Sequence, residues 1–545
     1  MNSSLASVTG ARSPYEAFAA QASANPDATF LAAPAAAELD YAPDGFAHPY
    51  GAFADEVATL AAAFAANGYG AGMRAGLLLE NRPVFFRHWM ALNAIGVSIV
   101  PINPDLKPDE IAFQLGLAKP EVVVALPERR DQVARSGYPA ERIAAPDGDA
   151  PPARAPRPPE TGRAEAECAL LFTSGTSGAP KGCILSNRYF LQLAGWYVNQ
   201  GGTAAMADGG EAVLTPLPLF HMNALGCSAL GMILKGGTLI PIDRFHASRW
   251  WRTVAASGAT IVHYLGVMPA ILLRREEEPA ERAHAVRFGF GAGVDADEKR
   301  RFEARFGIPL VEAWAMTETG AGAVTTTARE TGPLGPRCIG RPTPSTAWRV
   351  VADDGSEAPP GVPGELLVRA AGDDPRAGFF SGYLDDAAAT EAAWAGGWFH
   401  TGDVVTHDGT GLLTFFDRKK NVIRRSGENI AVLEVEAVLA GLPGVAAVAV
   451  APVPDDIRGE EVFALVVART DATADREAAE AIVHAASERL SYHKLPGWMA
   501  FVAAIPVTAT QKLRRGAIRE AADTLRTTGR AFDLRPLKAA LRHHG

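Results

Sequence analysis

Apolar residues in the N-terminal part of the chain switch between helical and strand spacing. Over residues 53–65 they recur every three or four positions, which predicts an amphipathic helix, and Gly68 and Gly70 end it before a strand at 75–79. A second helical pattern over 84–95 precedes an apolar strand at 97–102. Helices that alternate with buried strands are typical of α/β layers, so we expect that architecture here.

The pattern changes after residue 338 to short apolar runs separated by glycines. These runs predict a small β-rich subdomain, with strands at 347–351, 364–368 and 411–416. Beyond residue 421 a third pattern follows, with strands at 445–450 and 462–467 and a helix at 477–490. We therefore predict a compact α+β unit after a boundary near 418–421. The polar and basic segment 526–545 is expected to be peripheral.

Composition and charge narrow the class of protein. The chain has 545 residues, 48% hydrophobic and 21% charged, which indicates an ordinary globular protein with more than one domain. The net charge of −9 and the lack of Lys/Arg runs argue against nucleic-acid binding. The longest apolar run, 224–234, is too short to span a bilayer. No secretory signal is apparent, and the four cysteines lack metal-ligand spacing, so we expect a cytoplasmic protein without disulfides.

The most informative motif follows the apolar run 170–172 and reads T-S-G-T-S-G-A-P-K-G over residues 173–182. Its free N–H and O–H groups could face the oxygens of a polyphosphate, although a plain surface turn would also collect such residues. The P-loop pattern fails, because Pro180 and Gly182 replace the required glycine and hydroxyl residue around Lys181. The loop therefore predicts nucleotide handling of another kind.

This motif resembles the signature of the adenylate-forming superfamily, which includes acyl-CoA synthetases, peptide-synthetase adenylation domains and firefly luciferase. The resemblance implies that the loop binds the phosphates of ATP and that Thr173 is also a ligand of Mg²⁺. The positions carried over are Thr173, Ser174, Gly175, Thr176, Ser177, Gly178 and Lys181. It further implies an α/β N-terminal domain over 1–418, with two layered subdomains and a small β-rich barrel-like one, which binds AMP and the acyl group. A small mobile α+β domain is implied over 419–545.

Three further motifs of the N-terminal region match that family in order. His221, in P-L-F-H, resembles the histidine that borders the acyl pocket, and the absence of a carboxylate just after it argues against an amino-acid substrate. The turn around Gly291, Ala292 and Gly293, and the segment Glu312, Ala313, Trp314 and Ala315, resemble the adenine site. Trp314 would replace the usual tyrosine as the stacking ring. Thr317 is implied to bind the α-phosphate, and Glu318 to ligate Mg²⁺.

The remaining motifs fall toward the C-terminus. Asp403, in T-G-D, resembles the aspartate that binds both ribose hydroxyls, and Arg418 would contact the ribose. Lys420 takes the hinge position, and Gly427 and Glu428 belong to a segment implied to line the pantetheine tunnel. Lys512 resembles the lysine that bridges the substrate carboxylate and the α-phosphate, with Gln511 replacing a glycine before it.

The resemblance therefore implies an ATP-dependent acid–thiol ligase that uses ATP, Mg²⁺ and coenzyme A. A small-molecule carboxylic acid would be activated as acyl-AMP and then transferred to CoA, as in ligases of the crotonobetaine/carnitine type. Two alternatives stay open: adenylation alone or with transfer to a carrier protein, and a non-catalytic nucleotide-binding regulator on the same fold. No nucleic-acid partner and no transmembrane segment are expected. The oligomeric state is open, a homodimer included.

Overall fold

The chain forms two compact units in the computed structural model. The structure describes residues 10–173, 180–332, 334–352, 354–425, 428–456, 458–470, 472–490, 492–507 and 513–541. Unit 1 comprises Met1–Arg349, Leu367–His400 and Asp408–Thr414, and unit 2 comprises Val350–Leu366, Thr401–His407 and Phe415–Gly545. The mixed α/β architecture, with a large N-terminal and a smaller C-terminal part, confirms the predicted fold class. The boundary at 418/419 stays a prediction.

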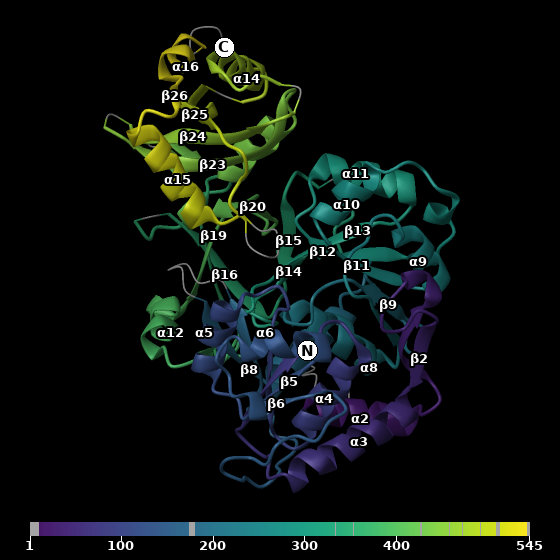
Figure 1. Cartoon of the computed structure of the whole chain (residues 1–545). Coiled ribbons are helices and arrows are strands. Elements are labelled where there is room, and N and C mark those ends of the chain that lie inside the picture. Colours follow the sequence, from purple (N-terminus) through teal and green to yellow (C-terminus); the bar gives the residue numbers. More distant parts are fainter. Residues whose placement is uncertain are drawn as a thin grey trace. The chain divides into compact units, whose positions relative to one another are not determined.

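One sheet of unit 1 runs in the order β15-β14-β13-β12-β11-β9-β10-β1-β2 (Figure 1). Its strands are β1 (Thr29–Pro34), β2 (Gly45–Pro49), β9 (Ala212–Thr215), β10 (Thr238–Pro241), β11 (Ile261–Leu265), β12 (Phe288–Ala292), β13 (Leu310–Trp314), β14 (Thr325–Thr326) and β15 (Cys338–Pro342). The central strands from β13 to β1 pair in parallel. In such a sheet the carboxyl ends of the strands form the usual ligand-binding edge.

Helices α9 (Trp250–Ser257), α10 (Val267–Leu273) and α11 (Ala296–Phe306) pack on one face of this sheet (Figure 1). The rings of Trp251 and Phe306 pack in a tilted arrangement at a centroid distance of 4.5 Å in the resulting core. Large aromatic side chains bury much apolar surface each, so these helices are held firmly against β9 to β13. The carboxyl ends of β11, β12 and β13 are thereby fixed relative to one another.

The other sheet of unit 1 runs in the order β18-β8-β7-β4-β3-β5-β6. Its strands are β3 (Arg74–Leu78), β4 (Ser98–Pro101), β5 (Val122–Ala125), β6 (Ile143–Ala144), β7 (Glu167–Thr173), β8 (Lys181–Ser186) and β18 (Gly382–Tyr383). The remaining helices of unit 1 include α2 (Pro14–Ala24), α3 (Tyr50–Ala66), α4 (Pro83–Ala94), α5 (Pro108–Ala118), α6 (Arg130–Ala134), α7 (Asn187–Val198), α8 (Gly231–Lys235) and α12 (Ala387–Ala393). Helices α3 and α4 and strands β3 and β4 confirm the alternation predicted from the N-terminal pattern.

The predicted β-rich segment contains β16 (Thr346–Val351), β17 (Gly364–Ala370), β19 (Phe399–His407) and β20 (Leu413–Arg418). The three strand positions predicted there are confirmed by β16, β17 and β20. Each of these four strands is divided between the two units, so each is described only by its own residues. No helix among the described residues is long and apolar enough to cross a membrane.

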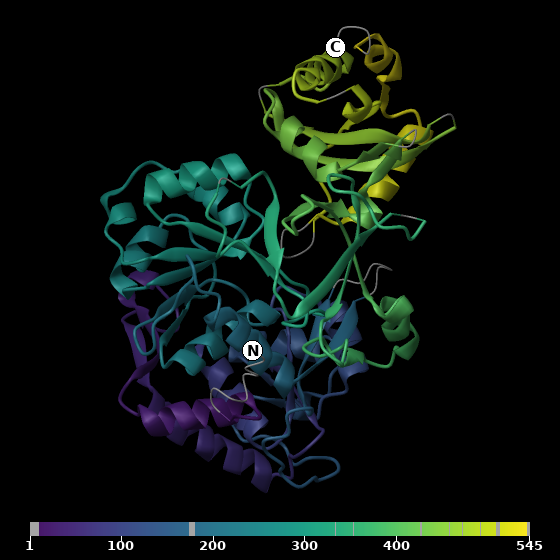
Figure 2. The ribbon, with the colours of Figure 1, turned by 180° about the vertical axis from the view of Figure 1, so that it is seen from behind.

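Unit 2 is a sheet with helices on both faces (Figures 1 and 2). Its elements are β21 (Ile423–Arg425), β22 (Glu428–Ile430), α13 (Val432–Ala440), β23 (Val445–Asp455), β24 (Gly459–Ala468), α14 (Arg476–Ser487), β25 (Trp498–Phe501), α15 (Arg515–Thr527), β26 (Phe532–Asp533) and α16 (Arg535–Leu541). Along β24, Val462 and Ala464 face the core under α13 and α14, whereas Phe463 and Leu465 face the core under α15. This alternation is the two-residue period of a strand buried on both faces. It confirms the predicted α+β unit.

The expectation that segment 526–545 is peripheral was wrong at Leu534 and Lys538, the two buried residues of its described part, 526–541. Lys538 on α16 is only 1% exposed, and its Nζ donates to Glu461 Oε1 at 2.6 Å and to the carbonyl of His493 at 3.0 Å. Arg425 Nε donates to the other oxygen of Glu461 at 2.8 Å. Burial lowers the pKa of Lys538 to about 8. Local composition could not predict that Lys538 is buried, because a lysine is buried only when it is paired and its partner, Glu461, is distant in the sequence.

Candidate functional site

The two ends of the T-S-G-T-S-G-A-P-K-G motif meet at the end of a β hairpin in unit 1. Strands β7 and β8 are antiparallel, and Thr173 pairs with Lys181. Strand β7 is buried from Cys168 to Leu171, which anchors the hairpin in the sheet. The loop residues Ser174, Gly175, Thr176, Ser177 and Gly178 lie outside the described residues. Thr173 and Lys181 thus mark the place from which the predicted phosphate loop leaves the sheet.

Tyr383 lies between two residues of the predicted site. Its hydroxyl donates to Glu318 Oε1 at 3.0 Å, and Lys181 Nζ lies over its ring at 4.6 Å from the centroid. Lys181 Nζ also lies 3.8 Å from Asp386 Oδ2. Glu318 is 7% exposed, and burial, the largest cause, raises the pKa of the Tyr383 phenol well above its usual range. The structure therefore brings the predicted phosphate lysine and the predicted metal ligand to the same side chain.

The backbone explains why Tyr383 occupies this position. Strand β18 pairs with β8 such that Tyr383 is opposite Cys183, two residues beyond Lys181. Three residues earlier in the chain, the N–H of Phe380 donates to the carbonyl of Glu318 at 2.9 Å. Sequence analysis missed Tyr383 and Asp386, because β18 has only two residues and its partner lies 200 positions away. A Gly-Tyr pair alone carries no distinctive signal.

Cys183 is a buried thiol beside these groups. Its Sγ lies 3.8 Å from Thr173 Oγ1, and its pKa is raised, first by burial and then by the negative charge of Glu318. The four cysteines of the chain are all buried with free thiols, as expected. A protonated thiol here fills space behind Thr173 and Glu318 without adding charge.

The predicted adenine segment is organised around the carboxylate of Glu312. Oε1 accepts from the Tyr264 hydroxyl at 2.6 Å, and Oε2 accepts from the N–H of Gly293 at 2.7 Å. Burial, the largest cause, raises the pKa of Glu312. At Gly291 a Cβ atom would lie 2.2 Å from the carbonyl of Tyr264, so only glycine allows β11 and β12 to approach this closely. Glu312 thus fixes the turn that follows β12.

The residues that follow Glu312 leave the sheet at the carboxyl end of β13. Ala313 and Trp314 end the strand, and Trp314 is 8% exposed. Ala315 is half-buried, and the carbonyl of Thr317 accepts from the Tyr189 hydroxyl at 2.8 Å. Ala292, at the end of β12, is exposed. Stacking of Trp314 on adenine and binding of phosphate by Thr317 stay predictions.

His221 precedes a π-helix, Asn223–Leu230, and its ring packs against Phe220 at 4.7 Å. Beneath that helix a second histidine, His263, is fully buried and bonded to the Tyr197 hydroxyl at 2.7 Å and to Ser228 Oγ at 2.8 Å. Burial lowers the pKa of His263 to about 3, so this ring is neutral near pH 7. π-Helices are frequent near functional sites, which agrees with the prediction for His221 without testing it.

The predicted ribose residues pair with each other in unit 2. Asp403 is 1% exposed, and its Oδ1 lies 2.6 Å from Arg418 Nε. Its backbone N–H donates to Thr401 Oγ1 at 3.0 Å, within the T-G-D motif. Asp417, next to Arg418, accepts from the backbone N–H groups of Arg418 and Leu433. A fixed carboxylate beside a guanidinium has the chemistry to accept bonds from a diol, and ribose binding by this pair stays a prediction.

The remaining predicted residues of unit 2 are only partly described. Lys420 lies in a short 3₁₀ turn, Lys419–Asn421, directly after β20. Gly427 lies outside the described residues, and of Glu428 only its backbone position at the start of β22 is described. Lys512 also lies outside them. The roles expected of these residues stay predictions.

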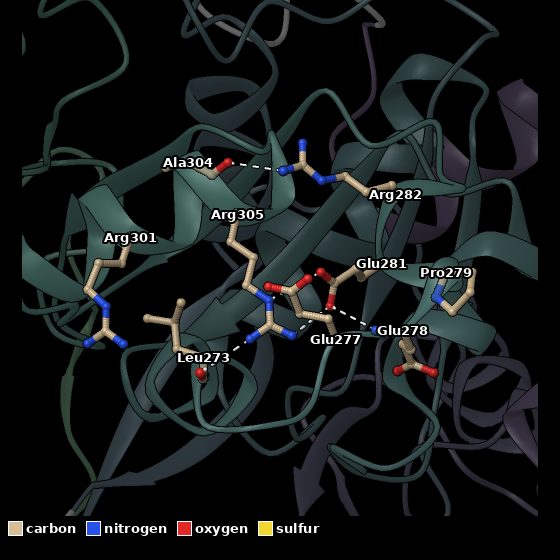
Figure 3. A pocket seen from close by; sticks show the side chains of 9 residues that line it. All are labelled: Leu273, Glu277, Glu278, Pro279, Glu281, Arg282, Arg301, Ala304 and Arg305. Atoms are coloured by element: carbon tan, nitrogen blue, oxygen red, sulfur yellow. Dashed lines mark hydrogen bonds and ion pairs between the residues drawn. The ribbon is translucent and has the colours of Figure 1, made fainter.

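A cavity of about 800 Å³ opens beside α10 and α11 (Figure 3), and its lining contains none of the predicted site residues. Arg305 donates to both oxygens of Glu281, at 3.2 and 2.7 Å, and to the carbonyl of Leu273. Arg282 donates to the carbonyl of Ala304. Hydrogen bonding to Arg305 lowers the pKa of Glu281. These pairs tie the end of α10 and the segment after it to the last turn of α11 and so have a structural role.

Glu318 is suited to Mg²⁺ by its chemistry. Mg²⁺ prefers oxygen ligands and usually takes one or two carboxylates, with phosphate and water supplying the rest. Among the described residues no group of three or more His, Cys, Asp or Glu side chains could hold a metal ion. A single carboxylate that shares Tyr383 with Lys181, together with the hydroxyl of Thr173 at the start of the predicted phosphate loop, fits a metal that arrives with its nucleotide.

Comparison with known proteins gives a consistent result. A family model described as AMP-binding enzyme matches residues 18–384, and one described as AMP-binding enzyme C-terminal domain matches residues 434–512. The chain is 33% identical over 491 residues to a sulfoacetate–CoA ligase of Cupriavidus necator, covering 86% of this chain and 92% of that protein. It is 29% identical over 496 residues to a crotonobetaine/carnitine–CoA ligase of Proteus mirabilis, covering 85% and 91%.

The fold is also found among solved structures. The crystal structure of ATP-bound MatB from Rhodopseudomonas palustris matches with a TM-score of 0.76 at 23% identity, covering 94% of this chain and 99% of that one. At this identity the match supports the shared fold.

Proposed function

The chain belongs to the AMP-binding enzyme family, and we propose that its site activates a carboxylic acid with ATP and transfers the acyl group to coenzyme A. The protein is an AMP-forming acid–thiol ligase. The observation that carries the proposal is that Lys181 and Glu318 both contact Tyr383. Lys181 lies over its ring and Glu318 accepts from its hydroxyl, at the end of the hairpin that bears the predicted phosphate motif. A cation and a metal-binding carboxylate at one loop suit a polyphosphate–metal complex.

In the first half-reaction the substrate carboxylate attacks the α-phosphorus of ATP, and pyrophosphate leaves. Lys181 binds the departing phosphates, Thr317 binds the α-phosphate, and Lys512 offsets charge on the reacting oxygens. Bound Mg²⁺, held by Glu318 and Thr173, supplies positive charge against the phosphates. Preorganised charges of this kind lower the barrier without a covalent bond to the protein.

In the second half-reaction the CoA thiolate attacks the acyl carbonyl of acyl-AMP, and AMP leaves. Asp403 and Arg418 hold the ribose in both steps, and Glu312 holds the turn against which adenine lies. His221 borders the acyl group, and Gly427 and Glu428 line the path of pantetheine. A change of backbone conformation at Lys420 would convert the arrangement that forms acyl-AMP into the arrangement that transfers the acyl group to CoA. Hinge residues act in this way in domain closure.

The acceptor is free CoA rather than a carrier protein. Two relatives that each cover more than 84% of this chain are named as CoA ligases. Their names give different acids at similar identity, so neither acid is carried over to this chain. A non-catalytic regulator is disfavoured, because Lys181, Glu318 and Asp403 are all retained.

The test is a panel of carboxylic acids incubated with the full chain, ATP, Mg²⁺ and CoA, with AMP and acyl-CoA measured by liquid chromatography. We expect AMP and a thioester in equal amounts for at least one acid. AMP without thioester would support adenylation for another acceptor. No AMP with any acid would reject the proposed function.

A further inference from the structure

We propose that Tyr383 is a positioning residue that presents both the metal-binding carboxylate of Glu318 and the phosphate-binding ammonium of Lys181, an inference that rests on the proposed function. It contacts both groups through different parts of one side chain. The hydroxyl reaches Glu318 Oε1 at 3.0 Å, and the ring face lies under Lys181 Nζ at 4.6 Å. Sites that act on a metal–polyphosphate complex need these two charges at a fixed separation.

The hydroxyl contact orients Glu318 and leaves it able to bind a metal. An ionised carboxylate offers about four lone-pair positions, and Tyr383 occupies one of them as a donor. The remaining positions retain the capacity to take a cation. Because the bond fixes the side-chain rotamer of Glu318, the entropic cost of ordering that carboxylate is met before a ligand arrives.

The ring contact holds Lys181 without neutralising it. The negative face of an aromatic ring attracts an ammonium group, yet the ring carries no net charge. The nearby carboxylate of Asp386 is a weak competitor, since it is 43% exposed and 3.8 Å away. The other oxygen of Asp386, Oδ1, caps α12 by accepting from the N–H of Ala389 at 2.9 Å, which holds the carboxylate in place while its Oδ2 faces Lys181. Lys181 can therefore leave Asp386 for a phosphate oxygen.

The short segment that carries Tyr383 contacts both the chain around Glu318 and strand β8, which carries Lys181. Its backbone N–H donates to Thr390 Oγ1 at 2.9 Å, and its ring packs edge-on against Phe380 at 4.8 Å. Phe380 in turn donates its N–H to the Glu318 carbonyl. Strand β18 also pairs with β8, on which Lys181 lies. A displacement of Tyr383 would thus alter both charged groups together.

Two substitutions separate the two contacts. Tyr383→Phe removes the hydroxyl and keeps the ring, so it should affect Glu318 alone. Tyr383→Leu removes both, so it should affect Lys181 as well. Tyr138→Phe is the matched control. It also removes one part-buried tyrosine hydroxyl, which donates to the carbonyl of Pro120 at 2.9 Å elsewhere in unit 1.

The measurement is the dissociation constant of ATP for each full-length variant by calorimetry, once with Mg²⁺ and once with EDTA. The Mg²⁺-dependent gain is the ratio of the two constants. We expect Tyr383→Phe to reduce that gain about tenfold, with less than a threefold change of the constant in EDTA. Tyr383→Leu should reduce the Mg²⁺-dependent gain as much as Tyr383→Phe does. It should also weaken ATP binding in EDTA about threefold relative to Tyr383→Phe. Tyr138→Phe should match the wild type in both.

The outcomes distinguish the inference from the proposed function. If the wild type binds ATP but Tyr383→Phe keeps the full Mg²⁺-dependent gain, the inference is overturned and the function stands. A loss of equal size in Mg²⁺ and in EDTA, or the same loss in Tyr138→Phe, would also overturn it. If the wild type binds no ATP, or gains nothing from Mg²⁺, the proposed function fails together with the inference. Thermal unfolding midpoints show whether each variant is folded. If Tyr383→Leu does not fold, Tyr383→Phe alone still tests the inference.

Discussion

The carboxylate of Glu312 accepts a hydrogen bond of 2.7 Å from the backbone N–H of Gly293. The same carboxylate accepts from the Tyr264 hydroxyl at 2.6 Å, so one buried side chain joins β13, β11 and the turn after β12. Family resemblance assigned Glu312 to the adenine site by its place in a motif. The structure adds the physical reason: without this acceptor, the N–H of Gly293 would lose its bond to β13, and the Tyr264 hydroxyl would keep only its bond to the carbonyl of Val311 at 3.0 Å.

We expect Glu312→Ala to weaken AMP binding about tenfold or more, because the turn after β12 loses its anchor and a hydrogen bond to a charged group is worth about 1.5–3 kcal/mol. Glu312→Gln keeps an acceptor oxygen for Gly293 and should bind AMP within about threefold of the wild type. Calorimetry with AMP provides the comparison. Wild-type affinity in Glu312→Ala would remove this turn from the nucleotide site.

The pair Asp403 and Arg418 leads to a second prediction. We expect Asp403→Ala to weaken binding of AMP by about 1.5–3 kcal/mol for each charged hydrogen bond to the ribose. The binding of inorganic pyrophosphate, which lacks a ribose, should not change. Asp475→Ala is the control, since Asp475 caps α14 in the same unit by accepting from the N–H of Ala478. Equal loss for AMP and pyrophosphate would show that Asp403 acts through folding.

Lys538 predicts a dependence of stability on pH. Burial lowers its pKa to about 8, below the ordinary value of 10.5. Between these values the unfolded state binds the proton and the folded state does not, so the free energy of unfolding contributed by Lys538 rises with pH. Calorimetric unfolding from pH 7 to pH 10.5 should therefore show the wild type gaining stability relative to Lys538→Met. Parallel curves for the two proteins would show that Lys538 has an ordinary pKa.

The sequence revealed the elements whose pattern is local and missed the contacts that depend on distant pairing. Helix α3 and strands β23 and β24 follow directly from apolar periodicity, and so does the end of strand β7 before the polar motif, whereas the pairing of Thr173 with Lys181 was not predicted. Tyr383 became visible only through the pairing of β18 with β8. Lys538 was misjudged for the same reason, because its partner Glu461 lies 77 positions earlier in the chain.

Lys512 gives the sharpest test of the division of labour between the half-reactions. If it stabilises charge only while the substrate carboxylate attacks the α-phosphorus, Lys512→Ala should slow adenylation by about 10²–10³, the usual cost of losing one preorganised charge. Thioester formation from supplied acyl-AMP and CoA should stay within about threefold of the wild type, since no phosphorus–oxygen bond forms in that step. Pyrophosphate release and acyl-CoA formation measure the two steps separately. Equal slowing of both would place Lys512 in a role common to the two half-reactions, such as binding the nucleotide.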